Sequence, residues 1–224
     1  MVDPVSDPVS EAPARGKFIT FEGSEGAGKS TNLAVVEAEL KSRGLPCYLT
    51  REPGGTPMAE QIRELVLEPR EETVDALTEL LLMFAGRNQH VAQEIEPRLA
   101  RGEWVLCDRF TDATYAYQGG GRGIAMDWIA TLETWVQGDL RPDLTLYFDI
   151  PPAQGAARIA DRELDRMEEQ KLEFFNAVRA VYTARAEAFD HIMLIDASQD
   201  LASVQAQVSR VTCDVLDRWL EERT

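Results

Sequence analysis

The stretch ITFEGSEGAGKS, residues 19–30, decides the fold. From Gly23 to Ser30 it fits G-x-x-x-x-G-K-[ST], the pattern of a glycine-rich loop whose backbone N–H groups hold phosphates. The apolar residues 17–22 before the loop predict a buried strand, and the pattern after it predicts an amphipathic helix. Strand, loop and helix follow in the order that a phosphate-binding loop requires, although a turn that serves only packing is the alternative.

Each defined position of that pattern has a physical purpose. Glycines let the backbone bend without Cβ clashes, so that N–H groups and the positive end of the following helix face anionic oxygens. Lys29 can reach the terminal phosphates of a nucleotide as a flexible charge. The hydroxyl of Ser30 can ligate Mg²⁺.

Composition limits the class of protein. The chain has 224 residues, of which 44% are hydrophobic, so it can bury one substantial core. Its net charge of −16 argues against a non-specific nucleic-acid or anionic-membrane surface. If the substrates are nucleotides, arginines, a lysine and Mg²⁺ must therefore create a local positive pocket.

The cysteines and the N-terminal segment indicate the compartment. Cys47, Cys107 and Cys213 lie far apart, without metal-binding or redox spacing, and we expect them to be reduced and inert. Residues 1–16 are rich in proline, serine and acidic residues and predict a flexible tail rather than a secretion signal. No apolar run approaches membrane-spanning length, so we expect a cytoplasmic protein with no membrane partner.

Five short apolar runs alternate with helical patterns. The runs are residues 17–22, 46–50, 103–108, 144–150 and 191–196. This alternation predicts a five-stranded parallel sheet in an α/β protein, with helices on both faces, and a single domain over residues 17–224. The longest helical pattern covers residues 74–100, and another ends at Gly138.

In an open parallel sheet ligands bind beyond the carboxyl ends of the strands, so the residues after each strand are candidates for the site. The second run is followed by a rigid turn that contains Glu52 and Pro53, and then by a helix that carries Arg63. Asp108 ends the third run and can hold the water shell of Mg²⁺, while Arg109 can bind a phosphate with two hydrogen bonds. A strand-end ion pair between Asp108 and Arg109 is the alternative.

Several segments together resemble the bacterial thymidylate kinases, in order and over nearly the whole chain from residue 16 onward. They are EGSEGAGKST (22–31), TREPGGTP (50–57), DRFTDATYAYQGGGRG (108–123), LRPDLTLYFDI (140–150), ELDRMEE (163–169) and FFNAVRAVY (174–182). The resemblance implies a P-loop nucleoside monophosphate kinase fold with a short mobile lid over about residues 155–169. It also implies transfer of the γ-phosphoryl group of ATP to dTMP in the presence of Mg²⁺.

The resemblance assigns roles to the glycine-rich loop. The residues expected to bind ATP are Gly23, Ser24, Glu25, Gly26, Ala27, Gly28, Lys29, Ser30 and Thr31. In similar enzymes the acidic side chain at the position of Glu25 reaches the 3′-hydroxyl of the acceptor sugar. The side chain of Glu25 therefore need not face the phosphates.

For dTMP, the resemblance assigns the acceptor phosphate to Arg63 and Arg109. Thr114 and Gln118 match the hydroxyl and the amide that bond to the thymine edge, and Arg87 matches the arginine that donates to a thymine carbonyl. Two further groups complete the expected site, Tyr117 near the 2′ position of the sugar and the Glu52–Pro53 turn beside the nucleotide.

Two departures from the family pattern leave choices open. The aromatic residue that stacks on the base usually lies four residues before the arginine, where this chain has Met83, and we expect the neighbouring Phe84 to stack instead. The lid is short of arginines, and of Arg158, Arg162 and Arg166 we expect Arg162 to join Lys29 and Arg109 in catalysis. Each lid arginine could also be a solvated surface residue.

Other functions remain as alternatives. Another nucleoside monophosphate kinase would share this fold and differ in its acceptor pocket. A nucleotide-dependent switch such as a GTPase would need an N-K-x-D segment, which the chain lacks. His90 and His191 share no metal-ligand spacing and receive no role. Similar enzymes are homodimers, and the apolar pattern of residues 77–95 is compatible with a homodimer.

Overall fold

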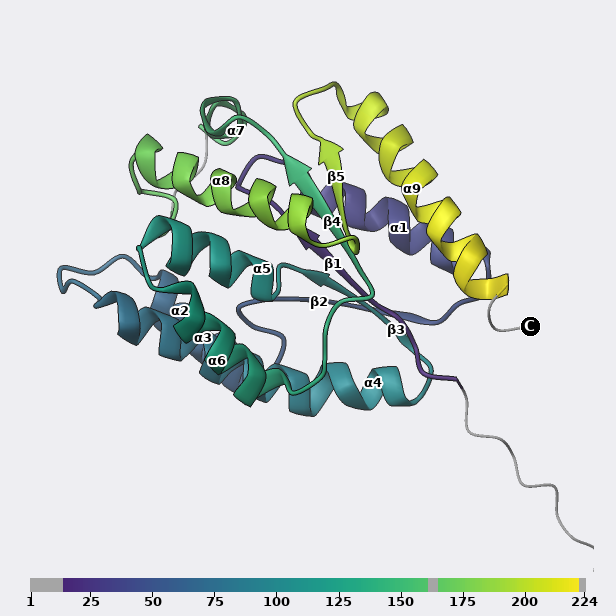
Figure 1. The fold of residues 1–224 in the computed structure, drawn as a ribbon, viewed down its shortest axis with the longest axis horizontal. Helices are drawn as coiled ribbons and strands as arrows, with labels where there is room; N and C mark the ends of the chain where they lie inside the picture. The colour runs from purple at the N-terminus through teal and green to yellow at the C-terminus, as the bar shows by residue number, and fades with distance from the viewer. Residues whose placement is uncertain (1–13, 161–164, 222–224) are drawn as a thin grey trace, which may run out of the picture.

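A five-stranded parallel sheet forms the centre of the computed structural model, which describes residues 14–160 and 165–221. The strands, in the order β2-β3-β1-β4-β5, are β1 (Phe18–Glu22), β2 (Cys47–Arg51), β3 (Trp104–Asp108), β4 (Leu144–Asp149) and β5 (Ile192–Asp196) (Figure 1). Every predicted strand is confirmed to within one residue at each end. Pairing aligns Phe21 of β1 with Asp108 of β3 and Leu146 of β4, so the carboxyl ends gather at one edge.

Helices cover both faces of this sheet. They are α1 (Lys29–Ser42), α2 (Pro57–Leu67), α3 (Ala76–His90), η1 (Val91–Ile95), α4 (Glu96–Ala100), α5 (Thr111–Thr114), η2 (Tyr115–Gly121), α6 (Met126–Gln137), α7 (Pro152–Arg158), α8 (Leu172–Ala188) and α9 (Leu201–Glu221). The predicted helical pattern of residues 74–100 is α3, η1 and α4 in succession. Gly138 ends α6 with a φ of 54°, a conformation in which glycine meets no Cβ penalty.

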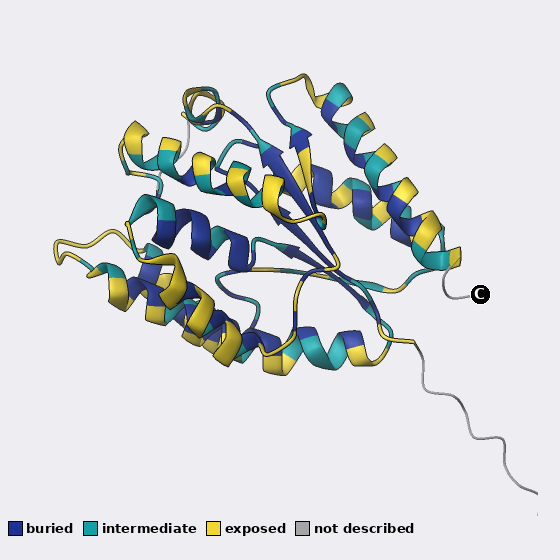
Figure 2. Cartoon of the chain, viewed as in Figure 1, coloured by how far each residue is buried: buried dark blue, intermediate teal, exposed yellow. Residues whose placement is uncertain are grey.

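Alternating side chains divide the core between the two faces. Phe21, Leu106 and Leu146 pack with apolar residues of α1 and α9, whereas Phe18 and Val105 pack with η1 and α4. Helix α8 covers β4 and β5 on that second face. The strands are mostly buried and the outer helix faces exposed (Figure 2). The edge strands β2 and β5 are more exposed than the central three. A parallel sheet with helices on both faces is the expected result of right-handed crossover connections.

The first described residues pack against the domain, although residues 1–16 were expected to form a tail. Arg15 pairs with Glu96, and the backbone N–H of Gly16 donates to the carbonyl of Leu99 at 2.8 Å. The earlier part of the predicted tail lies outside the described residues. Among residues 14–160 and 165–221, no helix is both long and apolar enough to cross a membrane.

Helices α3 and α6 leave large apolar side chains on the surface. Leu77 and Leu81 of α3 are exposed, as are Trp128 and Trp135 of α6, with exposed fractions of 55% and 78% for the two tryptophans. We call these four residues the α3–α6 face. Figure 2 shows α6 as mostly exposed on its outer side.

Candidate active site

The glycine-rich loop connects β1 to α1 at the carboxyl edge of the sheet. Gly26 and Gly28 have φ angles of 74° and 83°, which side chains rarely adopt. A Cβ on Gly26 would lie only 2.2 Å from the carbonyl oxygen of Gly155, so glycine is also required sterically. The loop therefore has the bent backbone that the sequence predicts.

Lys29 begins α1 and folds back over this loop. Its Nζ donates to the carbonyl oxygens of Gly23 and Ser24, both at 3.1 Å, and its side chain is buried. Burial lowers the pKa of Lys29, and the neighbouring Arg109 lowers it further. Those two carbonyls hold the ammonium group at the loop, where it is available to an anionic ligand.

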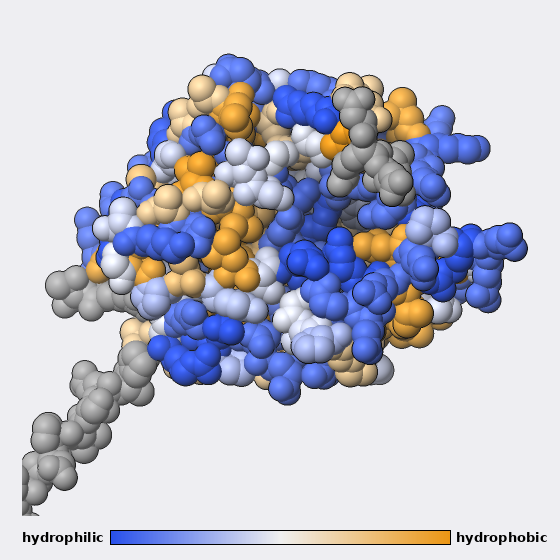
Figure 3. Space-filling model, turned by 180° about the vertical axis from the view of Figure 1, so that it is seen from behind, coloured by the Kyte–Doolittle hydropathy of each residue, from blue (hydrophilic) through white to orange (hydrophobic). Residues whose placement is uncertain are grey.

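Two neighbouring cavities open beyond the strand ends. We call the one beside the glycine-rich loop the loop pocket; it is lined by Glu25, Gly26, Gly28, Lys29, Ser30, Thr31, Arg51, Glu52, Arg63, Asp108 and Arg109. The other, with about 670 Å³ of empty space, is the deep pocket; it is lined by Glu25, Glu52, Pro53, Arg63, Leu67, Met83, Arg87, Arg109, Phe110, Ala113, Thr114, Tyr117, Gln118, Asp165, Met167, Glu168 and Phe175. Figure 3 shows one side of the molecule hollowed, with hydrophilic side chains around the recess.

The two pockets share Glu25, Glu52, Arg63 and Arg109. Arg63, from α2, donates to the carbonyl oxygen of Pro53 at 3.0 Å, which holds it at this boundary. The structure thus places every described residue of the predicted site in one pocket or the other, with the exceptions of Gly23, Ser24, Ala27 and Phe84. The first three belong to the loop itself.

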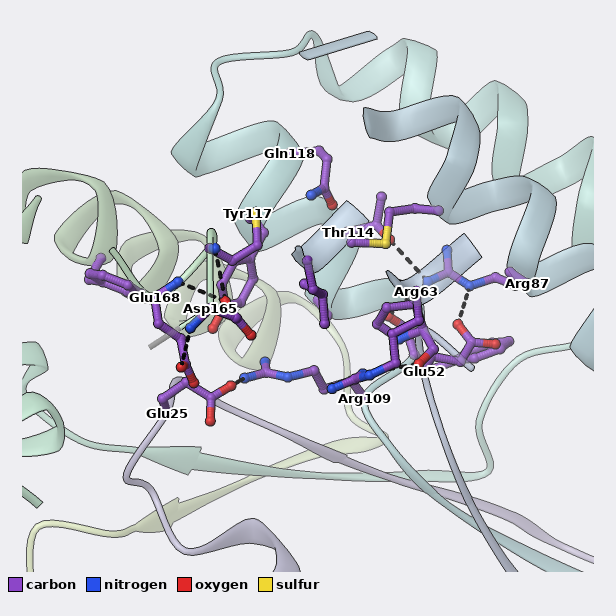
Figure 4. Close-up of a pocket in the computed structure, with 17 residues that line it drawn as sticks. Glu25, Glu52, Arg63, Arg87, Arg109, Thr114, Tyr117, Gln118, Asp165 and Glu168 are labelled. Atoms are coloured by element: carbon purple, nitrogen blue, oxygen red, sulfur yellow. Dashed lines mark hydrogen bonds and ion pairs between the residues drawn. The ribbon is translucent and has the colours of Figure 1, made fainter. Parts of the chain in front are cut away.

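Arg109 lies at the centre of the shared wall. It follows β3 with a φ of 68°, an uncommon value for a residue with a side chain. Its Nη2 donates to Oε1 of Glu25 at 2.5 Å, and its Nη1 donates to the hydroxyl of Tyr182 at 3.3 Å. Its partner is therefore Glu25, across the pockets, rather than the neighbouring Asp108. Figure 4 shows Arg109 and Glu25 pointing toward each other below the deep pocket.

A buried carboxylate that the sequence did not single out supports this arginine. Glu22, the last residue of β1, accepts hydrogen bonds from the hydroxyl of Tyr182 at 2.7 Å and from the N–H of Phe110 at 2.6 Å. Burial, followed by the nearby charge of Asp112, raises the pKa of Glu22 to about 7. The sequence shows a glutamate at the end of the first strand, but it gives no indication that Tyr182 of α8 is the partner of Glu22.

A second buried network holds Arg87 of α3. Its Nε donates to Oε2 of Glu52 at 2.7 Å, and its Nη2 donates to the hydroxyl of Thr114 at 3.0 Å. The other oxygen of Glu52 lies 3.0 Å from Nδ1 of His90. Although burial acts to raise the pKa of Glu52, the charge of Arg87 and the bond to His90 lower it overall.

This network leaves one group of Arg87 for a ligand. Its Nη1 is buried and has no hydrogen-bond partner among the residues that the structure describes. His90 received no role from the sequence, yet it supports the arginine through Glu52. A usable signal was its position three residues after Arg87, on the same side of the helix.

A third buried cluster surrounds Glu79, also on α3. Its carboxylate accepts hydrogen bonds from Gln118, Arg122 and Arg166. Glu79 was not predicted as a site residue, because a single glutamate in a helical pattern usually faces solvent. Gln118 lines the deep pocket.

The predicted stacking residue is wrong in this geometry. Phe84 is 2% exposed and packs in the core with Leu80, Tyr115 and Ile129, whereas Met83 lines the deep pocket. Met83 lies one helical turn, four residues, before Arg87, so both point to the pocket. Phe84 is the next residue, so its side chain is turned by about 100° around the helix axis from that of Met83 and faces the core.

The two lid arginines that the structure describes, Arg158 and Arg166, lie in different places. Arg158, at the end of α7, donates to the carbonyl oxygens of Gly26 at 3.3 Å and Ala197 at 3.0 Å. Arg166 donates to Glu79 and to the carbonyl oxygen of Val66. The predicted catalytic arginine, Arg162, lies outside the described residues.

Two oxygen-bearing side chains in the loop pocket fit the expected magnesium ligands. Ser30 and Asp108 both line that pocket, and Oδ1 of Asp108 is buried without a partner among the described residues. Hydroxyl and carboxylate oxygens suit Mg²⁺, which retains waters and binds substrate phosphates rather than a full protein cage. The described residues contain no group of three His, Cys, Asp or Glu side chains placed to hold a metal.

Comparisons with known proteins give the same family. A model of the family Thymidylate kinase matches residues 21–208. The chain is 58% identical to a thymidylate kinase of Pseudomonas syringae pv. tomato over 204 residues, which are 90% of this chain and 97% of the relative. It is also 58% identical to a thymidylate kinase of Pseudomonas putida over 205 residues, which are 91% of this chain and 98% of that relative. The crystal structure of thymidylate kinase from Ehrlichia chaffeensis superposes with a TM-score of 0.71 at 34% identity, covering 88% of this chain and 98% of that one. The chain belongs to the thymidylate kinase family.

Proposed function

We propose that the chain is a dTMP kinase that transfers the γ-phosphoryl group of ATP to dTMP, giving ADP and dTDP. The observation that carries this proposal is the meeting of the loop pocket and the deep pocket at Arg63 and Arg109. A phosphate-binding loop on one side and a base-sized pocket on the other bring two nucleotides end to end. Such positioning supplies much of the catalysis in phosphoryl transfer.

On the donor side, residues 23–31 hold the phosphates of ATP. Lys29 and the loop N–H groups neutralise charge that develops between the β- and γ-phosphates. Ser30 and Asp108 would hold Mg²⁺ in the loop pocket. When bound, Mg²⁺ supplies positive charge to the phosphate oxygens.

On the acceptor side, Arg109 and Arg63 bind the phosphate of dTMP. Arg109 exchanges its bond to Glu25 for this phosphate, and the carboxylate of Glu25 accepts a hydrogen bond from the 3′-hydroxyl of the sugar. An oxygen of the dTMP phosphate then attacks the γ-phosphorus, and ADP leaves with the electrons of the broken bond. The two arginines offset the repulsion between the reacting polyanions.

The deep pocket reads the sugar and the base. Arg87 donates to a thymine carbonyl through Nη1, which has no partner among the described residues, while Gln118 and Thr114 bond to the same edge. Met83 packs on the base in place of the aromatic residue of many relatives. The ring of Tyr117 crowds the 2′ position, which favours deoxyribose, and Glu52 with Pro53 shapes the adjoining wall.

A lid arginine completes the charge along the transfer path. Lys29 covers the donor side, and Arg109 and Arg63 are occupied by the acceptor phosphate. Arg166 is occupied by buried Glu79, so it is less suited to reach the reacting phosphates. We assign the role to Arg162, within a lid over about residues 155–169 of a domain that spans residues 17–224.

The chain acts in the cytoplasm as a homodimer. The α3–α6 face supports association, because large apolar side chains exposed on two helices that pack together can form an interface. Light scattering at several protein concentrations measures the mass in solution, and a monomer at all concentrations would contradict this assignment.

A coupled assay of ADP formation tests the function. With ATP fixed, dTMP should give a higher kcat/KM than dCMP, dGMP, UMP or CMP. A preference for another monophosphate would favour a different kinase of the same fold. Slow ATP hydrolysis that no acceptor accelerates would favour a nucleotide-dependent switch instead.

A further inference from the structure

Glu79 is a charged residue without contact with solvent, one turn into α3 behind the deep pocket. Its Oε1 accepts from Nε2 of Gln118 at 2.9 Å and from Nε of Arg122 at 3.2 Å. Its Oε2 accepts from Nη2 of Arg122 at 3.2 Å and from Nη2 of Arg166 at 2.5 Å. An ionised carboxylate offers about four acceptor positions, so this one is saturated.

Saturation determines the orientation of the Gln118 amide. Burial acts to raise the pKa of Glu79, but hydrogen bonds from Arg122, Gln118 and Arg166 lower it overall. The group is therefore ionised at neutral pH and can only accept hydrogen bonds. Gln118 must turn its NH₂ group to Glu79 and its carbonyl oxygen away. In Figure 4 the amide end of Gln118 points into the pocket, above Tyr117 and Thr114.

We propose that Glu79 is a positioning residue that locks the Gln118 amide with its oxygen toward the base, and so selects pyrimidines that carry a ring N–H beside the 4-position. This inference deepens the proposed function and rests on it. A 2,4-dioxo pyrimidine presents N3–H to the Gln118 oxygen. A 4-amino pyrimidine presents a bare N3, which leaves two acceptors facing each other and costs binding energy.

Arg87 completes a two-point pattern. Glu52 and Thr114 hold its guanidinium on the same wall, with the buried Nη1 unpartnered among the described residues. A donor from Arg87 beside an acceptor from Gln118 matches O4 and N3–H of a 2,4-dioxo pyrimidine. A 4-amino pyrimidine presents its amino donor to Arg87 and its N3 acceptor to the oxygen of Gln118, so neither hydrogen bond forms. A site built to hydrogen bond one edge rejects the other because its own polar groups stay unpaired.

The test is the kcat/KM ratio of dTMP to dCMP in Glu79→Gln. The two arginines keep the oxygen of the new amide at the Oε2 position, so its NH₂ group faces Gln118 and turns that amide over. We expect the dTMP:dCMP ratio to fall about tenfold, the size of one misplaced hydrogen bond. The loss for dTMP should appear mainly in KM. The dTMP:dUMP ratio should stay the same, because these substrates share the edge that Gln118 reads.

Arg166→Gln is the matched control. It removes a cation from the other oxygen of Glu79 but leaves Arg122 and the bond to Gln118 in place. We expect its dTMP:dCMP ratio to equal that of the wild type, even where its stability or turnover is lower. An equal loss of activity on dTMP, dUMP and dCMP in Glu79→Gln would mean that Glu79 is only structural, and would overturn the inference.

The double variant Glu79→Gln/Gln118→Glu keeps the charge of the cluster and serves where the single variant does not fold. The amide at position 79 is then the donor, and the carboxylate at position 118 presents its second oxygen to N3–H. We expect a dTMP:dCMP ratio near that of the wild type; a ratio as low as in the single variant contradicts the locking role. A wild type that does not phosphorylate dTMP would instead refute the proposed function itself.

Discussion

The loop pocket and the deep pocket share a wall but are built in different ways. The loop pocket consists largely of one contiguous segment, residues 25–31, whose backbone and first helical turn face the cavity. The deep pocket takes side chains from α2, α3, α5, η2, α8 and the end of the predicted lid, and buried ion pairs support this wall. A contiguous site depends on local conformation, whereas an assembled site depends on the packing of the whole domain.

This difference predicts how variants behave. Removing one partner of a buried ion pair leaves a charge without compensation, which destabilises the fold by about 3–5 kcal/mol. Removing a loop-pocket group that faces solvent and substrate affects transition-state charge instead. Loop-pocket variants should therefore separate activity from stability, and deep-pocket variants should couple them.

The largest expected effect is that of Lys29→Ala. Loss of the ammonium group should lower kcat for dTMP on the order of a thousandfold, because one preorganised donor to developing charge is removed. Lys29 itself lines the loop pocket, where water can replace its ammonium group, so the unfolding midpoint should change little. Steady-state kinetics and thermal unfolding measure the two effects. A loss of stability as large as the loss of kcat would contradict the idea that loop-pocket variants separate activity from stability.

Glu52→Gln should lower the free energy of unfolding by about 3 kcal/mol, because Arg87 keeps its charge in a buried position without a carboxylate. Urea denaturation measures this change, and KM for dTMP should rise with it. Glu96→Gln is the control, since it breaks the surface ion pair with Arg15. That pair should contribute less than about 1 kcal/mol. Similar destabilisation in both variants would contradict the importance of the buried network.

For Arg162→Ala we expect kcat to fall about a hundredfold or more, with little change in dTMP binding. Replacing Arg158 or Arg166 by alanine in the same way shows which lid arginine acts in catalysis. Arg166→Ala should affect dTMP binding and stability more than kcat, because Arg166 bonds to Glu79. Normal turnover in Arg162→Ala with a crippled Arg158→Ala would move the role to Arg158.

Glu22 should give the stability a pH dependence. Its pKa is raised to about 7, so between about pH 4.5 and 7 the folded chain holds a proton that the unfolded chain has released. The free energy of unfolding should therefore fall as pH rises through this window, by about 2 kcal/mol. Glu22→Gln should flatten that slope, as measured by urea titrations at pH 5, 6 and 7. An unchanged slope would exclude Glu22 as its source.

The smallest effect concerns the sugar. Replacing Tyr117 by Phe should preserve the rejection of ribonucleotides, because the rejection is steric. A smaller residue such as Ala should relax it by about tenfold, the range of a change in apolar contact. The ratio of kcat/KM for dTMP and for the corresponding ribonucleotide measures this preference. Equal ratios in the wild type and the alanine variant would remove Tyr117 from sugar selection.

The sequence predicted the sheet and the loop pocket because their signals are local. A strand such as residues 103–108 is a short apolar run, and the glycine pattern of residues 23–28 reflects φ angles that other residues rarely adopt. The deep pocket was predicted only through the family resemblance. Of its supports, Glu79 carries no local signature, since its partners come from distant segments, and His90 offers only its spacing from Arg87. The sequence could not distinguish Met83 from Phe84 as the residue that faces the base, because a shift of one residue along a helix changes the direction of the side chain.

The positions of the four tryptophans make the intrinsic fluorescence of this chain selective. Trp104 and Trp219 lie with their ring centroids 5.6 Å apart near α9, while Trp128 and Trp135 lie on the exposed α6. None of the four lines the loop pocket or the deep pocket. Emission from the α6 pair should therefore shift to shorter wavelength when a second chain covers that helix, and respond much less to nucleotide. A single dilution series, read at the emission maximum, would follow assembly without any label.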